Sequence, residues 1–192
     1  MNADFKISLP PVSNENAQGA AKDIIEGTQA KLGFVPNMYR AMANSPGYLS
    51  TYAHGYTEFR ENSGFTPQEQ EVVFLALSRE NGCDYCVAAH SMVADKMSNL
   101  DSGSLAAVRA GSALPDTKLQ ALAIFTKHVF DVRGMVGKSE AAAFLAAGFT
   151  EKQILEVVLA TAVKTLSNYS NHVFHTDIDD AFAGYRLEEM AD

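Results

Sequence analysis

Apolar residues recur along this chain at the three- and four-residue spacing of α-helices, and long alternating runs of β-branched residues are absent. Alanine, a strong helix former, supplies 28 of the 192 residues. Hydrophobic residues make up 47% of the chain, which is enough to bury a sizeable core in one compact unit. These features predict an all-α fold, a helical bundle that forms a single domain over residues 1–192.

Glycines, prolines and capping residues divide the chain into expected helices. Pro10 and Pro11 predict an extended arm over residues 1–15, because proline cannot continue a helix from its N-terminal side. Two capping boxes, at residues 66–69 and 150–153, are strong helix starts. We expect helices over residues 15–32, 37–43, 46–62, 66–81, 83–97, 101–110, 115–132, 139–148 and 150–175, and the acidic tail from residue 177 has room for one more.

The two capping boxes belong to a longer similarity at an offset of 84 residues. Seven residues of the segment 64–90 recur: Gly64, Phe65, Thr66, Val73, Leu75, Ala76 and Tyr85 return as Gly148, Phe149, Thr150, Val157, Leu159, Ala160 and Tyr169. We interpret residues 64–97 and 148–176 as a duplicated helical hairpin. Coincidence between two alanine-rich helices is the alternative.

The similarity does not extend to the reactive side chains. The second copy carries Leu155, Ser167, Ser170 and Phe174 where the first carries Glu71, Cys83, Cys86 and His90. We therefore expect the first copy to be active and the second to be architectural.

The formal net charge is −8 and the pI is about 5.1. An acidic chain repels nucleic-acid phosphates and anionic lipids, so neither nucleic acid nor a membrane is expected as a partner. No apolar run approaches the roughly 20 residues that span a bilayer, and no signal-peptide pattern opens the chain. The sequence therefore predicts a cytoplasmic protein.

The pattern with the most chemistry is Glu71-x11-Cys83-x2-Cys86-x3-His90. These are the chain's only two cysteines, and in a reducing compartment their spacing indicates redox chemistry or metal binding. Cys83, Cys86 and His90 share one helix face, being at positions i, i+3 and i+7. The cysteines also fall in the first turn, where free N–H groups and the helix dipole favour a thiolate.

Glu71 lies on the preceding helix, and an antiparallel pairing of the two helices brings it nearly level with His90. This geometry describes a proton relay, in which an imidazole accepts the proton of a thiol and a carboxylate orients the imidazole. The second thiol can then convert the oxidised first one into a disulfide. Four alternatives stay open: inert buried thiols, a zinc site built from these four side chains, a satisfied core histidine at His90, and a solvated Glu71 with Glu69 and Gln70 exposed.

Two further groups of residues are possible neighbours of this site. Tyr85 recurs as Tyr169 where no cysteine recurs, which indicates packing more than catalysis. Asn168, Asn171 and His172 form a polar cluster in the second copy, for which we favour capping or an oligomer contact over a place beside the thiols. No glycine-rich phosphate loop or dinucleotide fingerprint is present, so no cofactor and no resident metal are predicted.

The spacing E-x11-C-x2-C-x3-H resembles the alkylhydroperoxidase D branch of the carboxymuconolactone decarboxylase-like superfamily. Residues 33–37 (GFVPN), the pair Ser45-Pro46 and residues 83–90 (CDYCVAAH) are similar to its "peroxidase-related" members. The resemblance runs from about residue 32 to about residue 172. It implies an all-helical fold that assembles as a homotrimer or hexamer, and an antioxidant activity in which thiols reduce hydroperoxides.

The same resemblance implies roles for the individual residues. Cys86 is the peroxidatic cysteine that passes through a sulfenic acid, and Cys83 is the outer, resolving cysteine that meets a dithiol or protein reductant. His90 and Glu71 form the relay, while Tyr85 stands where some members carry a histidine. Lactone decarboxylation is disfavoured, because decarboxylases of the superfamily generally lack the cysteine pair.

Two other functions stay open at this point. One is a disulfide reductase or electron carrier for a partner peroxidase, which an exposed Cys83 beside a closed pocket would favour. The other is a non-catalytic oligomer with a small zinc site.

Overall fold

Nine α-helices and one short 3-10 helix make up the described part of the chain, residues 4–187 of the computed structural model, and this part holds no β-strand. Residues 1–3 of the predicted arm and residues 188–192 of the predicted acidic tail lie outside the described residues. The helices are α1 (Gly19–Leu32), α2 (Asn37–Met42), α3 (Pro46–Asn62), α4 (Pro67–Glu80), α5 (Asp84–Lys96), α6 (Ser102–Ala110), α7 (Thr117–Asp131), α8 (Lys138–Ala146), α9 (Glu151–Phe174) and the 3-10 helix η1 (Asp180–Tyr185). The all-α prediction is confirmed for this range.

The observed boundaries agree with the expected ones, except at the start of α1. The prediction began that helix near Glu15, whereas α1 begins at Gly19. Gly19 has a φ of +53°, outside the right-handed helical region, so the helix cannot continue back through it. Residues 5–13 form neither helix nor strand, residues 14–16 form a turn, and the Ile7 N–H donates to the carbonyl of Val173 at 2.8 Å.

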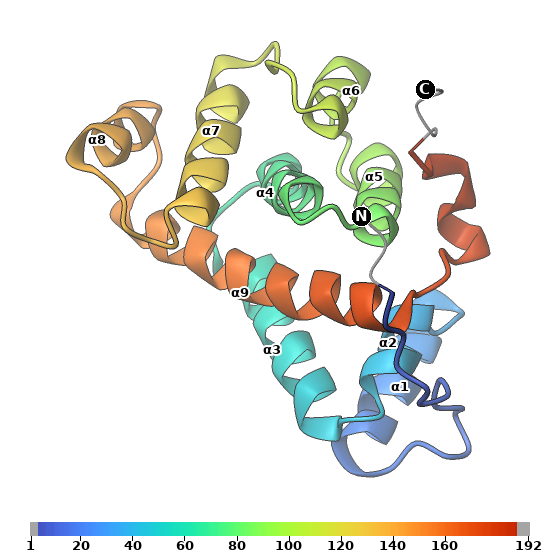
Figure 1. Cartoon of the computed structure of the whole chain (residues 1–192). Coiled ribbons are helices and arrows are strands. Elements are labelled where there is room, and N and C mark those ends of the chain that lie inside the picture. Colours follow the sequence, from blue (N-terminus) through green and yellow to red (C-terminus); the bar gives the residue numbers. More distant parts are fainter. Residues whose placement is uncertain (1–3, 188–192) are drawn as a thin grey trace.

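Helix α4 is the centre of the bundle (Figure 1). Its residues from Glu69 to Ser78 are all buried, and α5, α7, α9 and α6 pack around it. The expectation that Glu69 and Gln70 are exposed is therefore wrong. The Glu69 carboxylate caps α4 at the Thr66 N–H and pairs with Lys118 at 2.7 Å, while the Gln70 amide donates to two backbone carbonyls. Local hydrogen bonds thus satisfy polar groups that the sequence alone placed in solvent.

The two similar helix starts lie side by side. The rings of Phe65 and Phe149 are 5.8 Å apart, and the Gln153 side chain donates to the carbonyl of Gly64 at 3.2 Å. Both predicted capping boxes are present, at Thr66 and at Thr150. The recurring residues therefore build two equivalent helix starts that pack against each other.

The second copy is not a hairpin, and that part of the prediction is wrong. In the first copy, Gly82 has a φ of +66° and turns the chain from α4 into α5. Residues 165 and 166, the counterparts of Asn81 and Gly82, are threonine and leucine, which continue a helix. Helix α9 consequently runs unbroken for 24 residues, and it crosses α3, α4, α2, α5 and α7 (Figure 1).

The segment after α9 returns to cover α5. Arg109 of α6 donates to the carbonyls of Tyr185 and Arg186, and the Tyr185 hydroxyl donates to Asp95 at 2.5 Å. Within residues 4–187, none of the helices combines the length and the apolar character that crossing a bilayer needs.

Candidate functional site

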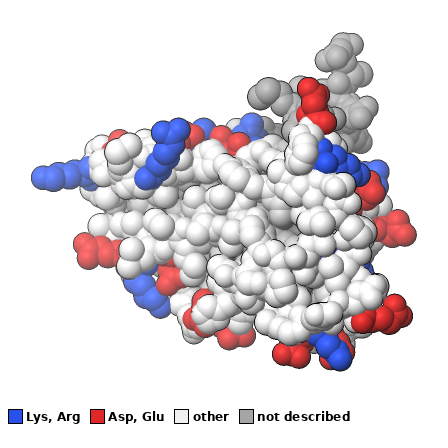
Figure 2. Space-filling model, turned by 60° about the horizontal axis from the view of Figure 1, so that its bottom comes forward, with Lys and Arg blue, Asp and Glu red and all other residues white. Residues whose placement is uncertain are grey.

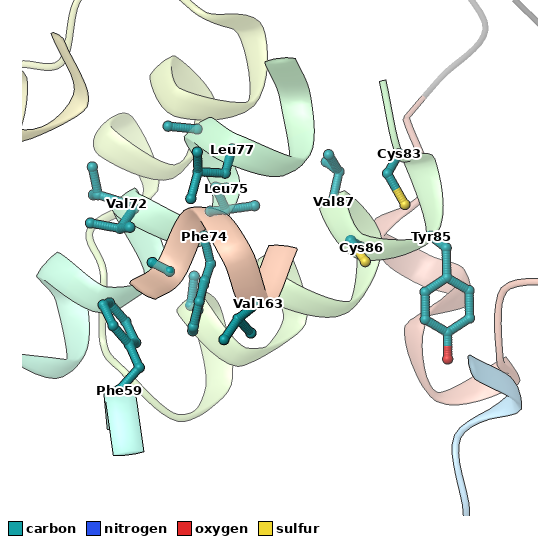
Figure 3. Close-up of a cluster of buried hydrophobic side chains, with 14 of the residues drawn as sticks. Phe59, Val72, Phe74, Leu75, Leu77, Cys83, Tyr85, Cys86, Val87 and Val163 are labelled. Atoms are coloured by element: carbon teal, nitrogen blue, oxygen red, sulfur yellow. The ribbon is translucent and has the colours of Figure 1, made fainter. Parts of the chain in front are cut away.

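The two cysteines lie where α4 turns into α5. Cys83 is the N-cap residue of α5 and Cys86 lies in its first turn, and both are free thiols. Figure 3 shows the two sulfur atoms close together, with the Tyr85 ring directed away from them. Each cysteine is only 2% exposed. Cys83 is therefore not an outer, exposed residue within one chain, contrary to what the resemblance implied.

Helix α9 forms the opposite wall of the thiol pair. The Asn171 amide nitrogen lies 3.3 Å from the Cys86 sulfur and 3.7 Å from the Cys83 sulfur. A side-chain amide in this position donates to both sulfurs, and such donation stabilises a thiolate. The preference for capping or an oligomer contact is thus wrong for Asn171.

Its neighbours in the predicted polar cluster have other places. Asn168 is fully buried and accepts a 2.8 Å hydrogen bond from Asn81, which ties α9 to the turn before Cys83. His172 stacks on Tyr169, with ring centres 6.3 Å apart, and within residues 4–187 it has no hydrogen bond to either sulfur. Asn168 therefore holds the turn that leads into Cys83, whereas His172 lies outside the site.

The thiols share a hydrogen bond, and their pKa values move in opposite directions. The pKa of Cys83 is lowered to about 6, first by the hydrogen bond from Cys86 and then, against the effect of burial, by the positive charge of Lys164 and the Asn171 amide. The pKa of Cys86 is raised well above its ordinary value, first by burial and then by Cys83. Near neutral pH the pair therefore holds one proton, with the thiolate on Cys83.

The predicted approach of Glu71 and His90 is confirmed. Glu71 is fully buried, and its Oε2 lies 2.9 Å from Nδ1 of His90. Its other oxygen forms an ion pair with Arg60 of α3 at 2.5 Å. Burial alone raises the pKa of Glu71, but His90 and Arg60 together hold it below its ordinary value. The alternative of a solvated Glu71 is wrong, because the carboxylate is a buried ion with two partners.

His90 is a neutral imidazole at pH 7. Its pKa is lowered to about 4, first by burial and then by the charge of Lys164, although Glu71 acts in the other direction. A carboxylate can only accept a hydrogen bond, so Nδ1 carries the hydrogen and Nε2 is left as an acceptor. Within residues 4–187, His90 has no hydrogen bond to either sulfur. Of the contacts that the predicted relay needs, the one between Glu71 and His90 is present.

Two charged residues of this region were missed by the sequence reasoning. Arg60 neutralises Glu71, and it lies over the rings of Tyr56 and Phe74 at 4.9 and 4.8 Å. Lys164 is 1% exposed, with its ammonium 5.5 Å from the Phe74 ring centre. A signal existed for Lys164, because it follows Val157 and Ala160 at helical spacing on the buried face of its helix. Nothing in the sequence marks Arg60 as the partner of Glu71.

Tyr85 has a structural role toward the C-terminal segment. Its hydroxyl donates to Asp179 at 2.5 Å, and its ring contacts Phe182 edge-on with centres 6.0 Å apart. This agrees with the predicted packing role. Tyr169, its counterpart in α9, is 51% exposed, so the two tyrosines do not share a role.

The site has no metal-binding group. Across residues 4–187, no three His, Cys, Asp or Glu side chains come together in a way that could hold a metal ion. The zinc site considered from Glu71, Cys83, Cys86 and His90 therefore has no geometric basis here.

Residues 46–127, from the start of α3 into α7, match the Carboxymuconolactone decarboxylase family. The superfamily resemblance is confirmed. The matched residues include α4 and α5, and with them all four residues of the E-x11-C-x2-C-x3-H pattern. The carboxymuconolactone decarboxylase segment thus holds the thiols and the relay, while Lys164 and Asn171 come from α9 beyond it.

Solved structures share the fold over nearly the whole chain. One is an alkylhydroperoxidase AhpD core, an uncharacterized peroxidase-related protein from Ralstonia eutropha JMP134, with a TM-score of 0.81, 23% identity, and coverage of 91% of this chain and 93% of that one. Another is an uncharacterized peroxidase-related protein from Silicibacter sp. TM1040, with a TM-score of 0.75, 19% identity, and coverage of 95% and 94%.

A third is the debrominase Bmp8 in complex with 2,3,4-tribromopyrrole, with a TM-score of 0.76, 15% identity, and coverage of 94% of this chain and 96% of that one. None of the curated proteins is similar enough to this chain to count as a match. At these identities the likeness establishes the AhpD-like fold, and proteins of that fold include both peroxidase-related proteins and a debrominase. The reaction of this chain must therefore be argued from its own site.

Proposed function

We propose that this protein is a dithiol hydroperoxidase, an enzyme that reduces alkyl hydroperoxides with Cys83 and Cys86 and needs no bound cofactor. The observation that carries the proposal is the hydrogen-bonded thiol pair with a lowered pKa at Cys83 and a shared donor in Asn171. A thiolate is the reactive form of cysteine, so a pair that keeps one thiolate at neutral pH is ready to attack an electrophile.

The two sulfurs can divide the reaction between them. The resting thiolate is on Cys83, and a proton shift along the shared hydrogen bond moves the charge to Cys86, the sulfur that the resemblance assigns to the attack. The Cys86 thiolate bonds to the terminal oxygen of the hydroperoxide, the O–O bond breaks, and the alkoxide leaves as an alcohol after taking a proton. The Cys83 sulfur then displaces water from the sulfenic acid to form the disulfide.

Two electrons from an external dithiol restore the pair. In sum, two thiols and one hydroperoxide give a disulfide, an alcohol and water. The acceptor Nε2 of His90, backed by Glu71 and Arg60, is the group we propose to receive and return protons in this cycle. The expectation of a cytoplasmic protein stays a prediction, and a reducing compartment would suit such a cycle.

Burial of the thiols favours a small substrate over a protein partner. An electron carrier must bring its sulfur against the disulfide of another protein, and this requires an exposed cysteine. Cys83 and Cys86 are each 2% exposed, so the exposed Cys83 expected for a carrier is not found. A hydroperoxide with a short chain needs a much smaller opening.

The reaction can be tested on the reduced full-length protein. One equivalent of ethyl hydroperoxide is expected to produce an intramolecular disulfide, seen by mass spectrometry as a loss of two hydrogens, and excess dithiothreitol should sustain peroxide consumption. Cys86→Ser and Cys83→Ser should each abolish turnover, with the double variant as the background. Thiols that stay unmodified after one equivalent would refute the proposal. If 2,3,4-tribromopyrrole oxidises the pair and the hydroperoxide does not, the reaction is instead of the debrominase kind.

We also propose that the protein is a homo-oligomer, a trimer or a hexamer, which associates through α9. Five exposed residues of this helix form one stripe at helical spacing: Leu155, Val158, Ala162, Tyr169 and Val173. Figure 2 shows a face whose middle carries few charged side chains, with most of the charges around its edge. Exposed apolar stripes of this kind commonly mark association surfaces.

Light scattering after gel filtration tests this association. The wild type is expected to elute at a multiple of the 20.7 kDa chain mass. The double variant Leu155→Glu, Val158→Glu should shift toward the monomer, because it places two charges on the stripe. A monomeric wild type at micromolar concentration would contradict the proposal.

A further inference from the structure

Lys164 of α9 is a buried cation. It is 1% exposed, and its ammonium lies 5.5 Å from the ring of Phe74, which in turn packs on His90 with ring centres 4.8 Å apart. Across residues 4–187, no carboxylate oxygen lies within the 4.0 Å of an ion pair with Lys164. Burying a charge destabilises a protein unless an opposite charge compensates it, so an anion is expected nearby.

The buried face of α9 points to that anion. Lys164, Ser167 and Asn171 lie at positions i, i+3 and i+7, so they share one side of the helix, and all three are buried. Asn171 contacts both sulfurs, and the Ser167 hydroxyl is a hydrogen-bond partner of Cys86. Lys164 belongs to the same wall, one turn farther along the helix toward its N-terminus.

We propose that Lys164 is the buried counter-ion of the single thiolate that Cys83 and Cys86 share. It is a positioning residue, which acts by keeping one sulfur negatively charged inside an apolar core. This inference deepens the proposed dithiol chemistry and rests on it. The charge of Lys164 lowers the pKa of both cysteines, in agreement with the geometry.

The other titratable groups around the thiols do not compete for this role. They come from α2, α3, α4 and α5: Tyr39, Tyr52, Tyr56, Arg60, Glu71, Tyr85 and His90. Burial raises the pKa of each of the tyrosines, which stay neutral, and His90 is neutral as well. Arg60 is already paired with Glu71 at 2.5 Å. The thiolate and Lys164 are thus the two charges in this group that have no other charged partner among the residues named here.

Because of this pairing, the oxidation state of the cysteines decides whether the charge of Lys164 is compensated. Disulfide formation removes the thiolate and leaves the ammonium without its counter-ion. Reduction by two electrons and one proton restores the thiol–thiolate pair and the compensation with it. Lys164 therefore favours the reduced form, and replacing it should make the disulfide harder to reduce.

The decisive variant is Lys164→Met, whose unbranched side chain is one heavy atom shorter than that of lysine and carries no charge. Lys152→Met, an exposed lysine at the start of the same helix, is the matched control. The rate of iodoacetamide alkylation of the reduced protein is measured from pH 4 to pH 10. In Lys164→Met the midpoint should rise by about one pH unit, so that alkylation at pH 6 becomes about five times slower, whereas Lys152→Met should keep the wild-type profile.

The disulfide equilibrium with glutathione gives a second readout. At pH 7, with the same concentrations of reduced and oxidised glutathione, the ratio of reduced to oxidised protein should be about five times lower for Lys164→Met than for the wild type. Lys164→Arg should recover part of both effects because it restores the charge. A folded Lys164→Met with an unchanged alkylation profile would overturn the inference.

The wild type alone keeps the inference testable if Lys164→Met does not fold. An alkylation midpoint at or above pH 8 in the wild type would overturn it without any variant. Peroxide consumption is assayed separately. If the protein consumes no hydroperoxide but the alkylation midpoint still shifts in Lys164→Met, the hydroperoxidase proposal fails and the counter-ion role stands. The two failures can therefore be told apart.

Discussion

Nδ1 of His90 lies 2.9 Å from Oε2 of Glu71, although the two residues are 19 positions apart and on different helices. The contact joins the two central helices through a buried ion, since the other oxygen of Glu71 pairs with Arg60. Stability and acid–base chemistry are therefore linked at one carboxylate.

Replacing Glu71 by leucine, the residue found at its counterpart Leu155, should destabilise the protein strongly. Arg60, whose side chain is only 19% exposed, would lose its anion, and His90 would lose its acceptor. Removing one partner of a buried ion pair costs about 3–5 kcal/mol. The measurement is the free energy of unfolding from urea denaturation of the reduced protein.

Glu26→Leu is the matched control, because Glu26 of α1 is exposed and has only a 3.7 Å contact with the exposed Lys22. It should change the free energy of unfolding by less than about 1 kcal/mol. Equal effects of the two substitutions would show that Glu71 is not a buried, compensated ion in solution.

The stability of the protein should fall as the pH is lowered from about 6.5 to about 4. The pKa of His90 is about 4 in the folded state against an ordinary value of 6.5, so the unfolded chain binds the proton first. The contribution is fully present above pH 6.5 and is lost as the pH falls through this window. It amounts to roughly 3 kcal/mol.

The measurement is urea denaturation of the wild type and of His90→Phe at pH 7 and at pH 4.5. His90→Phe copies Phe174, the counterpart in α9, and should flatten this part of the pH dependence while other groups keep theirs. If the free energy of unfolding changes equally between the two pH values in both proteins, His90 titrates normally in the folded state.

Loss of the Asn171 amide should slow the reaction of the thiols. Asn171→Leu keeps the approximate volume but removes the donor that reaches both sulfurs, so the pKa of the Cys83 thiol should rise from about 6. Hydrogen bonds to charged groups contribute about 1.5–3 kcal/mol, and a loss of this size corresponds to a thiolate population at pH 6 that is at least about sixfold lower. Iodoacetamide alkylation at pH 6 and at pH 9.5 checks this.

At pH 9.5 the difference between Asn171→Leu and the wild type should nearly vanish, because both proteins are then largely ionised. His172→Leu, next to Asn171 but without a bond to either sulfur, is the control and should keep the wild-type rates. A rate reduced equally at both pH values would indicate a change in access and not in ionisation.

Asp179 should control access to the buried thiols. Its carboxylate accepts from the Tyr85 hydroxyl and from the Asn37 backbone, and so fastens the segment after α9 to α5 and α2. Asp179→Ala leaves these donors without a partner, and local opening should become about tenfold more frequent. Alkylation of the reduced cysteines at pH 8 should accelerate by about the same factor.

Asp180→Ala is the control for this segment, since Asp180 is exposed at the next position. It should leave the alkylation rate unchanged. If Asp179→Ala reacts no faster than Asp180→Ala, the reagent reaches the sulfurs by another route.

Most of the helical framework follows from local signals in the sequence. The capping box of Thr66 and the turn at Gly82 set the ends of α4, and both act within a few residues. The approach of Glu71 to His90 also follows, because it needs only helix geometry and an antiparallel turn. These features were predicted and are observed.

Features that depend on distant contacts were not predicted. The burial of Glu69 depends on Lys118, 49 positions away, and the charge of Glu71 depends on Arg60 of a third helix. The exposure of Cys83 was misjudged because Asn171 of α9, which lies against its sulfur, comes 88 positions later. Similarity between the two halves identified equivalent helix starts, yet it also led to a hairpin that the Thr165–Leu166 sequence does not form.

The unbroken course of α9 gives one helix two different neighbours. Ser167 and Asn171 face the sulfurs from one side, while Tyr169 and Val173 stand on the outer surface between and beyond them. A helix moves largely as a rigid unit, so a contact that shifts the outer face of α9 also shifts the Ser167 and Asn171 side chains beside the sulfurs. Association of subunits through α9 would then alter the reactivity of the cysteines through the same helix.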